Sequence, residues 1–573
     1  MTEHTTSNES DAPPTRDDQY VSPPENGPKK LIPAPRVFWP AAALLVVFVG
    51  AALVFPAKLD SVLGSINGTV VGDLGWFYVI TVTGFVFYSI WIAVSPMGSI
   101  VLGDKDEDPE YSLPTWFAML FAAGMGIGLV FWGVAEPLNH FNTPPPGGAP
   151  SAAASAREAM DTTFLHWGLH AWAIYVVVGL SVAYAVHRKG RPVSIRWALE
   201  PLFGTRVVKG VLGDVVDVLA IIGTLFGVAT SLGFGVSQVG AGLGHLGVAD
   251  VDPETGTVGT TLLVVLIVVI TAIAVVSVAS GVDKGIRLLS NANMILAGLL
   301  MLIVLVLGPT VFLLSDFVQQ VGSYLQNFLS LSFRTFAFSG EEGKTWLSGW
   351  TTFYWGWWIS WSPFVGVFIA RISRGRTVRE FVAGVLLVPT VVGMLWFSVF
   401  GGSGIYREMF GDGGLVAADG TISTDLALFQ LLDGLPASTL LSILAMVLVV
   451  VFFVTSSDSG SFVVDMIASG GMATPPLWSR VMWASLEGAI AAALIVVGGA
   501  GGTGLSALQT MAILVAAPFS IVMILMAWAT AKELLAEHGA IVHGRRRHFR
   551  TSLKQEVRAD MKDLIDSVGR RRH

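Results

Sequence analysis

The sequence of 573 residues lacks cysteine and is poor in charge. Without cysteine it holds no disulfide, no thiolate metal site and no cysteine nucleophile. Charged residues make up 13% of the chain and hydrophobic residues 53%, whereas a typical soluble domain carries about 25% charged residues. This composition excludes an ordinary soluble protein and predicts a membrane protein. The net charge of −7, without a basic stripe interleaved with aromatic residues, argues against a nucleic-acid partner.

Twelve apolar runs are each long enough, at roughly 20 residues, to cross a bilayer as a helix. Strands of a membrane β-barrel are only about 10 residues long and alternate in polarity. We therefore expect an all-α polytopic membrane protein with twelve transmembrane helices. The runs lie near 38–56, 75–98, 114–137, 164–186, 212–243, 260–280, 291–315, 348–370, 380–401, 437–466, 479–498 and 505–531.

Charge in the connections predicts the orientation of the chain. The connections after the fourth and eighth runs are basic, whereas the loops 57–74 and 244–259 contain almost no Lys or Arg. The positive-inside rule places basic connections in the cytoplasm, and twelve spans then leave both termini there. Residues 1–36 are polar, rich in Pro and acid, and without a secretory signal, which predicts a disordered cytoplasmic tail. Residues 532–573 are expected to form a charged cytoplasmic tail that either keeps the chain end solvated or binds anionic lipids.

One helical stretch is expected to lie on the membrane surface. Residues 316–331, DFVQQVGSYLQNFLSL, carry their apolar residues on one face of a helix. That pattern is typical of an interfacial amphipathic helix. We therefore expect an extracellular helix and loop over 316–345.

Two polar or irregular stretches interrupt the apolar runs. Gly124, Gly126 and Gly128 fall within five residues of the third run. Glycines four residues apart can serve close helix packing, but three so close also favour unwinding, which membrane depth tolerates only around a polar cavity. The tenth run contains FFVTSSDSGS, at 452–461, whose hydroxyls either bond to their own helix or offer oxygen ligands. Together the stretches predict two walls of one Na⁺ site.

The eighth run contains the aromatic stretch FYWGWWISWSPF. Such a stretch can form an interfacial belt, fill a core or hold a ligand. Its aromatics run through the middle of the span, which disfavours the belt. Trp357, Trp358 and Trp361 share one side of a helix. Phe353 and Trp355 point elsewhere, and we expect them to serve packing.

A second aromatic face lies in the fourth run, at Trp167, Trp172 and Tyr175. Two such faces can form a cage that holds a quaternary ammonium group by cation–π attraction. Neither stretch contains an acidic residue, which favours a zwitterion over a bare cation. His166 and His170 are expected to pack or hydrogen-bond without a carboxylate partner, so they predict no metal site and no membrane enzyme. A channel is also disfavoured, because the sequence has no acidic ring or repeated filter motif.

Three motifs resemble those of a known family: FYWGWWISWSPFVGVFIARISRGRTVREF, AAGMGIGLVFWGVAEP and GVDKGIRLLSNANM. They closely resemble the betaine–choline–carnitine transporter family, over about residues 38–531, and most of all its sodium-coupled glycine betaine symporters. The resemblance implies a leucine-transporter-like fold with two inverted five-helix repeats. On this chain the repeats would span 113–315 and 346–531, with two extra transmembrane helices in 37–112.

The resemblance also implies site residues. It assigns an aromatic box to Trp167, Trp172, Tyr175, Trp357, Trp358 and Trp361. It assigns one sodium site to the carbonyls of Ala122, Met125 and Phe452 with the hydroxyls of Thr455 and Ser456, and a second to Thr224 and Phe364. At the second site the family has a further threonine where this chain has Val228. Gly128 stands where relatives that take choline with protons tend to carry Asp.

The function implied by the resemblance is import of glycine betaine or a similar compatible solute. Na⁺ would be the coupling ion, with no other cofactor, and the protein would be a homotrimer in the cell membrane that responds to osmotic stress. Ectoine, carnitine or choline, with different or no sodium coupling, are the alternative cargoes within the family.

Overall fold

The structure is a computed structural model that describes residues 34–124, 126–251, 258–280, 283–499 and 506–570. These described residues belong to one compact unit. Nearly all of the expected N-terminal tail, and Met125 of the expected sodium site, lie outside the described residues.

Regular structure within the described ranges is helical, apart from two isolated β-bridges. Ten helical segments of this part are long and apolar enough to cross a membrane. The expected fold class, an all-α polytopic membrane protein, is thereby confirmed, while the count of twelve spans stays a prediction. The helices are α1 (Pro35–Val54), α2 (Pro56–Val94), α3 (Leu113–Gly124), α4 (Ile127–Asn142), α5 (Ala152–Trp167), α6 (Leu169–Ala183), α7 (Glu200–Val208), α8 (Val211–His245), α9 (Thr260–Ser280), α10 (Asp283–Leu307), α11 (Thr310–Ser332), α12 (Gly340–Leu347), α13 (Phe353–Arg371), α14 (Val378–Phe410), α15 (Ala427–Asp433), α16 (Ser438–Ala468), α17 (Leu477–Gly499) and α18 (Ser506–Arg570).

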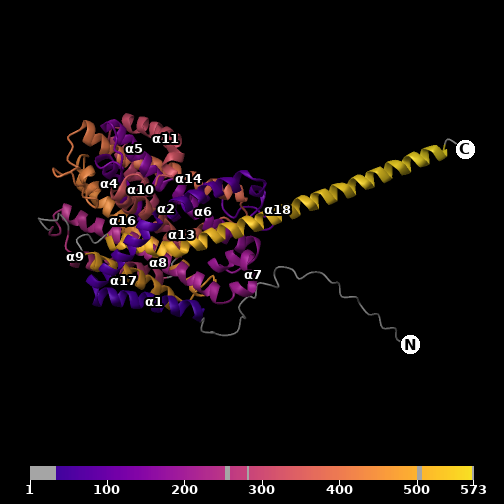
Figure 1. The fold of residues 1–573 in the computed structure, drawn as a ribbon, viewed down its shortest axis with the longest axis horizontal. Helices are drawn as coiled ribbons and strands as arrows, with labels where there is room; N and C mark the ends of the chain where they lie inside the picture. Colours follow the sequence, from indigo (N-terminus) through magenta and orange to yellow (C-terminus); the bar gives the residue numbers. More distant parts are fainter. Residues whose placement is uncertain (1–33, 125, 252–257, 281–282, 500–505, 571–573) are drawn as a thin grey trace. The chain divides into compact units, whose positions relative to one another are not determined.

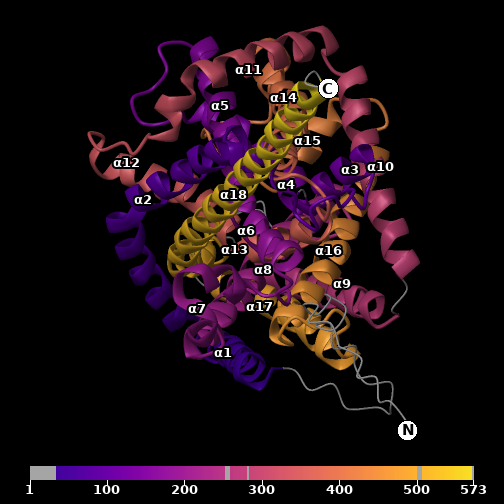
Figure 2. The same cartoon turned by 90° about the vertical axis from the view of Figure 1, so that its right-hand side faces the viewer.

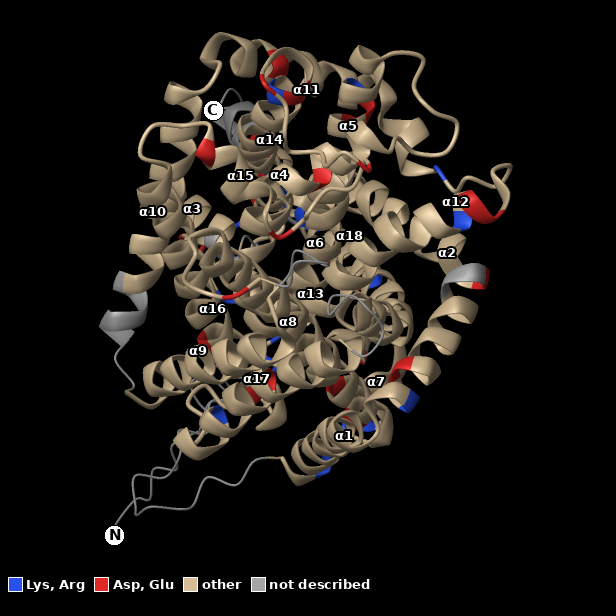
Figure 3. Cartoon of the chain, turned by 90° about the vertical axis from the view of Figure 1, so that its left-hand side faces the viewer, with Lys and Arg blue, Asp and Glu red and all other residues tan. Residues whose placement is uncertain are grey.

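Two of the twelve expected spans are not among these ten segments. The third run is divided between α3, of 12 residues, and α4, of 16 residues, so neither piece crosses a bilayer alone. The eighth run forms a π-helical turn at Ser348–Thr352 followed by α13, of 19 residues. Tryptophan, serine and glycine contribute little to mean hydropathy, which explains why α13 is not in the set. Figure 3 shows most of the ribbon in tan, because charged residues are few.

Helix α13 lies inside the bundle. Every residue from Phe353 to Val367 is buried. The helix packs against α6, α8 and α18, which surround it in Figures 1 and 2. An aromatic helix enclosed on several sides can present side chains to a site but cannot form an interfacial belt, so the observed burial agrees with the sequence argument.

The expected boundary between the seventh run and the surface helix differs from the observed one. The structure ends α10 at Leu307 and begins α11 at Thr310, so that the expected amphipathic stretch continues from α11 without interruption. Gly308 and Pro309 stand between the two helices. Proline lacks the amide hydrogen that a continuing helix needs, which places the break there. Helix α11 packs against α5 and α14.

Helix α18 continues through the expected C-terminal tail as one helix of 65 residues. Glu537 forms an ion pair with Arg188, and Glu533 lies 2.6 Å from Lys189, so the start of the tail is bound to the chain just after α6. Beyond these pairs Figure 1 shows the helix, in yellow, running on past the helices that its first half contacts.

Candidate functional site

The glycine run in the third apolar stretch coincides with a helix break. Helix α3 ends at Gly124 and α4 begins at Ile127, while Gly126 has φ −146° and ψ −143°, outside the helical region. Gly128 lies in the first turn of α4. A break at this depth leaves backbone carbonyls and amides without helical partners, which makes them available to a ligand.

Three separate elements meet at this break. A Cβ added to Gly126 would lie 3.6 Å from Oγ of Ser456 in α16 and 3.6 Å from Cη2 of Trp361 in α13. The structure therefore brings the glycine run, the hydroxyl-rich helix and the aromatic helix together.

Two hydroxyls of α16, those of Thr455 and Ser456, form what we call the hydroxyl wall, and that of Thr455 is bonded to its own helix. Oγ1 of Thr455 donates to the carbonyls of Val451, at 2.9 Å, and Phe452, at 3.2 Å. The predicted ligands Thr455 and Phe452 thus lie side by side, and Ser456 faces the break. Ala122 lies in the last turn of α3, and Met125 is outside the described residues. Such oxygen atoms suit a hard cation such as Na⁺.

The two predicted aromatic walls lie in contact. The rings of Trp357 and Trp358 stack with centroids 4.6 Å apart. Trp167 meets Trp358 edge to face at 4.9 Å and Trp357 at 6.1 Å. Tyr175 lies 6.4 Å from Trp358, and Trp172 reaches the group through Tyr175 at 5.3 Å. We call the six predicted residues Trp167, Trp172, Tyr175, Trp357, Trp358 and Trp361 the aromatic cage. Ring contacts join the first five within the described part of the chain, whereas the ring of Trp361 meets Phe364.

A second helix break lies beside the cage. Helix α5 ends at Trp167, and Gly168 has φ −96° and ψ −134°, before α6 begins at Leu169. A Cβ on Gly168 would lie 2.4 Å from the carbonyl oxygen of Phe164, so the break requires glycine. The carbonyl of His166 accepts a hydrogen bond from Nε1 of Trp358 at 2.9 Å. The indole of Trp358, a cage residue, therefore provides the hydrogen-bond donor for a backbone carbonyl at the break.

The residues that pack around the cage also agree with their expected places. Phe353 stacks on Trp357 at 5.6 Å, and Trp355 stacks on His170 at 5.4 Å, outside the cage. Within the described residues, Nε1 of Trp361 and the hydroxyl of Tyr175 are buried without a hydrogen-bond partner. Two unpaired donors in a closed site favour a ligand with acceptor oxygens.

The second predicted sodium site is less complete. Thr224 is buried in α8, and its hydroxyl has no hydrogen-bond partner among the described residues. Phe364 lies on α13, which packs against α8, and touches Trp361 edge to face at 5.7 Å. Val228 instead packs toward α16, 3.2 Å from the position of a Cβ on Gly460. Thr230, two residues further along α8, has its hydroxyl directed at other groups: it donates to the Phe226 carbonyl and lies 3.2 Å from the Leu508 carbonyl.

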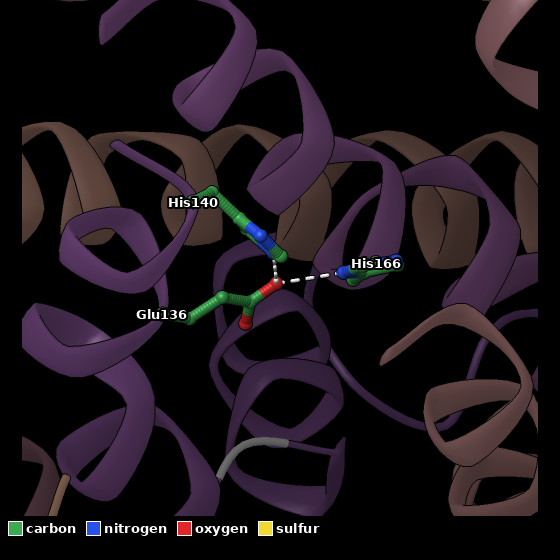
Figure 4. Close-up of side chains that lie close together, drawn as sticks. All are labelled: Glu136, His140 and His166. Carbon is green, nitrogen blue, oxygen red and sulfur yellow. Dashed lines mark hydrogen bonds and ion pairs between the residues drawn. The ribbon is translucent and has the colours of Figure 1, made fainter. Parts of the chain in front are cut away.

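A buried polar cluster that the sequence argument missed lies behind the cage. Figure 4 shows the carboxylate of Glu136 between the rings of His140 and His166. Oε1 of Glu136 lies 2.7 Å from Nδ1 of His166 and 3.5 Å from Nε2 of His140. The expectation that His166 lacks a carboxylate partner is therefore wrong. That expectation considered only residues close to His166 in sequence, whereas its partner Glu136 lies on α4 and His166 lies on α5.

The cluster is bonded to the cage directly. Oε2 of Glu136 accepts hydrogen bonds from Nε1 of Trp167, at 2.6 Å, and from the hydroxyl of Tyr354. Nε2 of His166 lies 2.9 Å from Oγ1 of Thr351. Glu136, His140 and His166 have no exposed side-chain surface.

Comparison with known proteins gives the family. A model of the family described as BCCT, betaine/carnitine/choline family transporter, matches residues 36–539. An uncharacterised transporter of Mycobacterium tuberculosis is 49% identical over 542 residues, which cover 94% of this chain and 87% of the relative. Glycine betaine transporter 1 of Vibrio parahaemolyticus is 46% identical over 86% of this chain and 91% of its own. Glycine betaine transporter OpuD of Bacillus subtilis is 43% identical over 88% of this chain and 95% of its own.

Proposed function

The chain belongs to the betaine/carnitine/choline family of transporters, a family of carriers rather than enzymes, and we propose that it imports glycine betaine or a similar compatible solute together with Na⁺. The observation that carries this proposal is the juxtaposition of cage and break. Trp361 of the aromatic cage and Ser456 of the hydroxyl wall both face Gly126. A cation–π site for a trimethylammonium group then lies beside oxygen atoms that suit Na⁺.

Coupling follows from this proximity. A solute and an ion that share one break each stabilise the same closed arrangement of helices, so each raises the affinity for the other. The ion site at Phe452, Thr455 and Ser456 is the one to which we assign the coupling. Because Val228 lies where the family has a further threonine, we assign no role to the second site at Thr224 and Phe364.

The same proposal covers location and assembly. We infer that the protein lies in the cell membrane with both termini in the cytoplasm, and the basic connections that contain Arg188 and Arg374 support this orientation. Homotrimeric assembly, contact with anionic lipids and activation by osmotic stress belong to the proposal because the family resemblance implies them.

Uptake by the purified chain in liposomes tests the proposal. We expect labelled glycine betaine to accumulate under an inward Na⁺ gradient and to stop accumulating when K⁺ replaces Na⁺. Competition by unlabelled ectoine, carnitine and choline ranks the cargoes. Equal uptake with and without Na⁺ would refute the coupling. No uptake of any of the four solutes, each also supplied in labelled form, would refute the substrate class.

Gly128 offers a test of how tightly the cage is built. A Cβ at this position would lie 2.6 Å from Cη2 of Trp357 and 2.9 Å from Cη2 of Trp167, so Gly128→Ala must displace both rings. Overpacking of this kind costs about 1–3 kcal/mol, and we expect KM for glycine betaine to rise about tenfold. Gly298→Ala is the matched control, because nothing lies within 4 Å of a Cβ there. A KM unchanged in both variants would show that the cage tolerates the extra methyl group.

A further inference from the structure

A fully buried glutamate in an apolar run needs partners. A charged or polar group inside an apolar environment is costly unless it is hydrogen-bonded. Glu136 is 0% exposed, and both of its oxygens lie within hydrogen-bond distance of donors from other elements. The partners are His166 and Trp167 at the end of α5 and Tyr354 at the start of α13. The carboxylate therefore connects α4 to both walls of the cage.

Two of these donors, Trp167 and Tyr354, have rings that lie in the cage or against it. Trp167 is itself a cage residue and meets Trp358 at 4.9 Å. Tyr354 stacks on Trp358 with centroids 6.0 Å apart and planes at 29°, and it meets Trp167 at 5.6 Å. Because Nε1 of Trp167 and the hydroxyl of Tyr354 donate to the same oxygen, Oε2 of Glu136, their rings are held at a fixed angle to each other.

The third donor holds another indole indirectly. The ring of His166 lies between Glu136, through Nδ1, and Thr351, through Nε2. The backbone carbonyl of the same His166 accepts from Nε1 of Trp358. A side chain that fixes His166 thus also fixes the carbonyl to which Trp358 is bonded. Glu136 reaches Trp167 and Trp358 by separate routes.

A hydrogen-bond network accounts for the cluster better than a metal site does. Glu136, His140 and His166 offer ligand atoms within 4.8 Å of one another. Zinc holds each nitrogen or oxygen ligand at about 2.0–2.2 Å, so two ligands of one ion stand farther apart than the 2.7 Å between His166 and Glu136. Oε2 of Glu136 is also already used by two donors.

We propose that Glu136 is a positioning residue that sets the orientation of the aromatic cage and so determines its affinity for the quaternary ammonium group. This inference rests on the proposed function of glycine betaine transport. Cation–π attraction depends on the placement of the cation over ring faces. Rings that lose their hydrogen bond to Glu136 sample other orientations. Ordering them again when the solute binds costs conformational entropy and lowers the affinity.

The test compares two substitutions of the glutamate in liposome uptake. Glu136→Leu removes every acceptor, and we expect KM for glycine betaine to rise about tenfold or more, with Vmax per folded transporter changed less than about threefold. Glu136→Gln is expected to restore KM to within about twofold of the unaltered protein. Its amide oxygen can accept from Trp167 and Tyr354, and its amide nitrogen can donate to an unprotonated Nδ1 of His166. A KM for Glu136→Leu equal to that of the unaltered protein would overturn the inference.

A double-mutant cycle separates positioning from general damage. Tyr354→Phe removes one hydroxyl, and we expect it alone to raise KM about threefold; combined with Glu136→Leu it should add little, because the shared bond is already lost. Additive effects in the double variant would overturn the inference. If Glu136→Leu fails to fold, an unchanged KM for Tyr354→Phe alone would overturn it.

Glu487→Leu is the matched control. Glu487 is likewise fully buried, in α17, but it accepts from Ser457 of α16 rather than from a cage residue. We expect it to lower the amount of folded transporter and to leave KM unchanged. If the unaltered protein fails to take up glycine betaine, the proposed function is refuted instead, so the two failures are distinguishable.

Discussion

Replacing Trp358 with leucine is expected to raise KM for glycine betaine by about thirtyfold. Trp358 has ring contacts with more cage residues than any other member of the cage has. It stacks on Trp357, meets Trp167 edge to face and lies near Tyr175. A cation–π contact in a desolvated site is worth on the order of 2 kcal/mol, which corresponds to about thirtyfold in affinity. The leucine also leaves the carbonyl of His166 without its donor. Initial rates of uptake over a range of solute concentrations measure the effect.

Trp355→Leu provides the control for this prediction. Trp355 lies on the same helix and is 2% exposed, but it stacks on His170 outside the cage. Losing a buried indole should reduce stability in both variants, whereas only Trp358→Leu should shift KM. If the two variants raise KM equally, the aromatic stretch acts as a packing unit and the cage assignment is wrong.

Combined substitution of Thr455 and Ser456 by alanine is expected to abolish most of the stimulation of uptake by Na⁺. The two hydroxyls are the side-chain ligands assigned to the ion, and Ser456 faces the α3–α4 break. Without them a bound Na⁺ keeps only carbonyl oxygens, which we expect to weaken ion affinity by about a hundredfold. Uptake measured against Na⁺ concentration should shift its half-saturation upward, with KM at saturating Na⁺ affected far less.

Ser461→Ala is the matched control for the ion site. Ser461 lies in the same helix and is buried, and its hydroxyl donates to the carbonyl of Asp458. Its loss removes a hydroxyl from α16 without touching the break. Equal loss of Na⁺ stimulation in this variant would indicate that α16 acts through its rigidity rather than through ion ligands.

The apolar runs predicted most of the helices, because a bilayer demands a minimum length of apolar helix and the sequence shows it directly. Boundaries were harder where one helix follows another closely. The break between α10 and α11 falls at Gly308–Pro309, earlier than the change from apolar to amphipathic sequence suggested. Proline sets such a boundary through its backbone, whereas hydropathy reports only side chains.

The cage and its support were predictable to different degrees. Helical spacing placed Trp357 and Trp358 on one side of α13, and the aromatic residues of the fourth run indicated Trp167 on the other wall. Glu136 was missed although it is the only charged residue in the third apolar run. An acidic residue alone in such a run is a functional candidate by default. Its partners could not be read from spacing, because Trp167 and Tyr354 lie on helices distant in sequence.

The burial of the cage has a consequence for turnover. Its six side chains are between 1% and 4% exposed, so a solute in the proposed site is occluded and would not reach it by diffusion alone. Helices must separate for each molecule admitted and each one released, and collective motions of that size take about microseconds to milliseconds. The rate of transport is therefore limited by how often the helices move, whereas flux through an open pore is limited by how often solute collides with it. Warming the membrane should accelerate transport far more steeply than it accelerates diffusion in water.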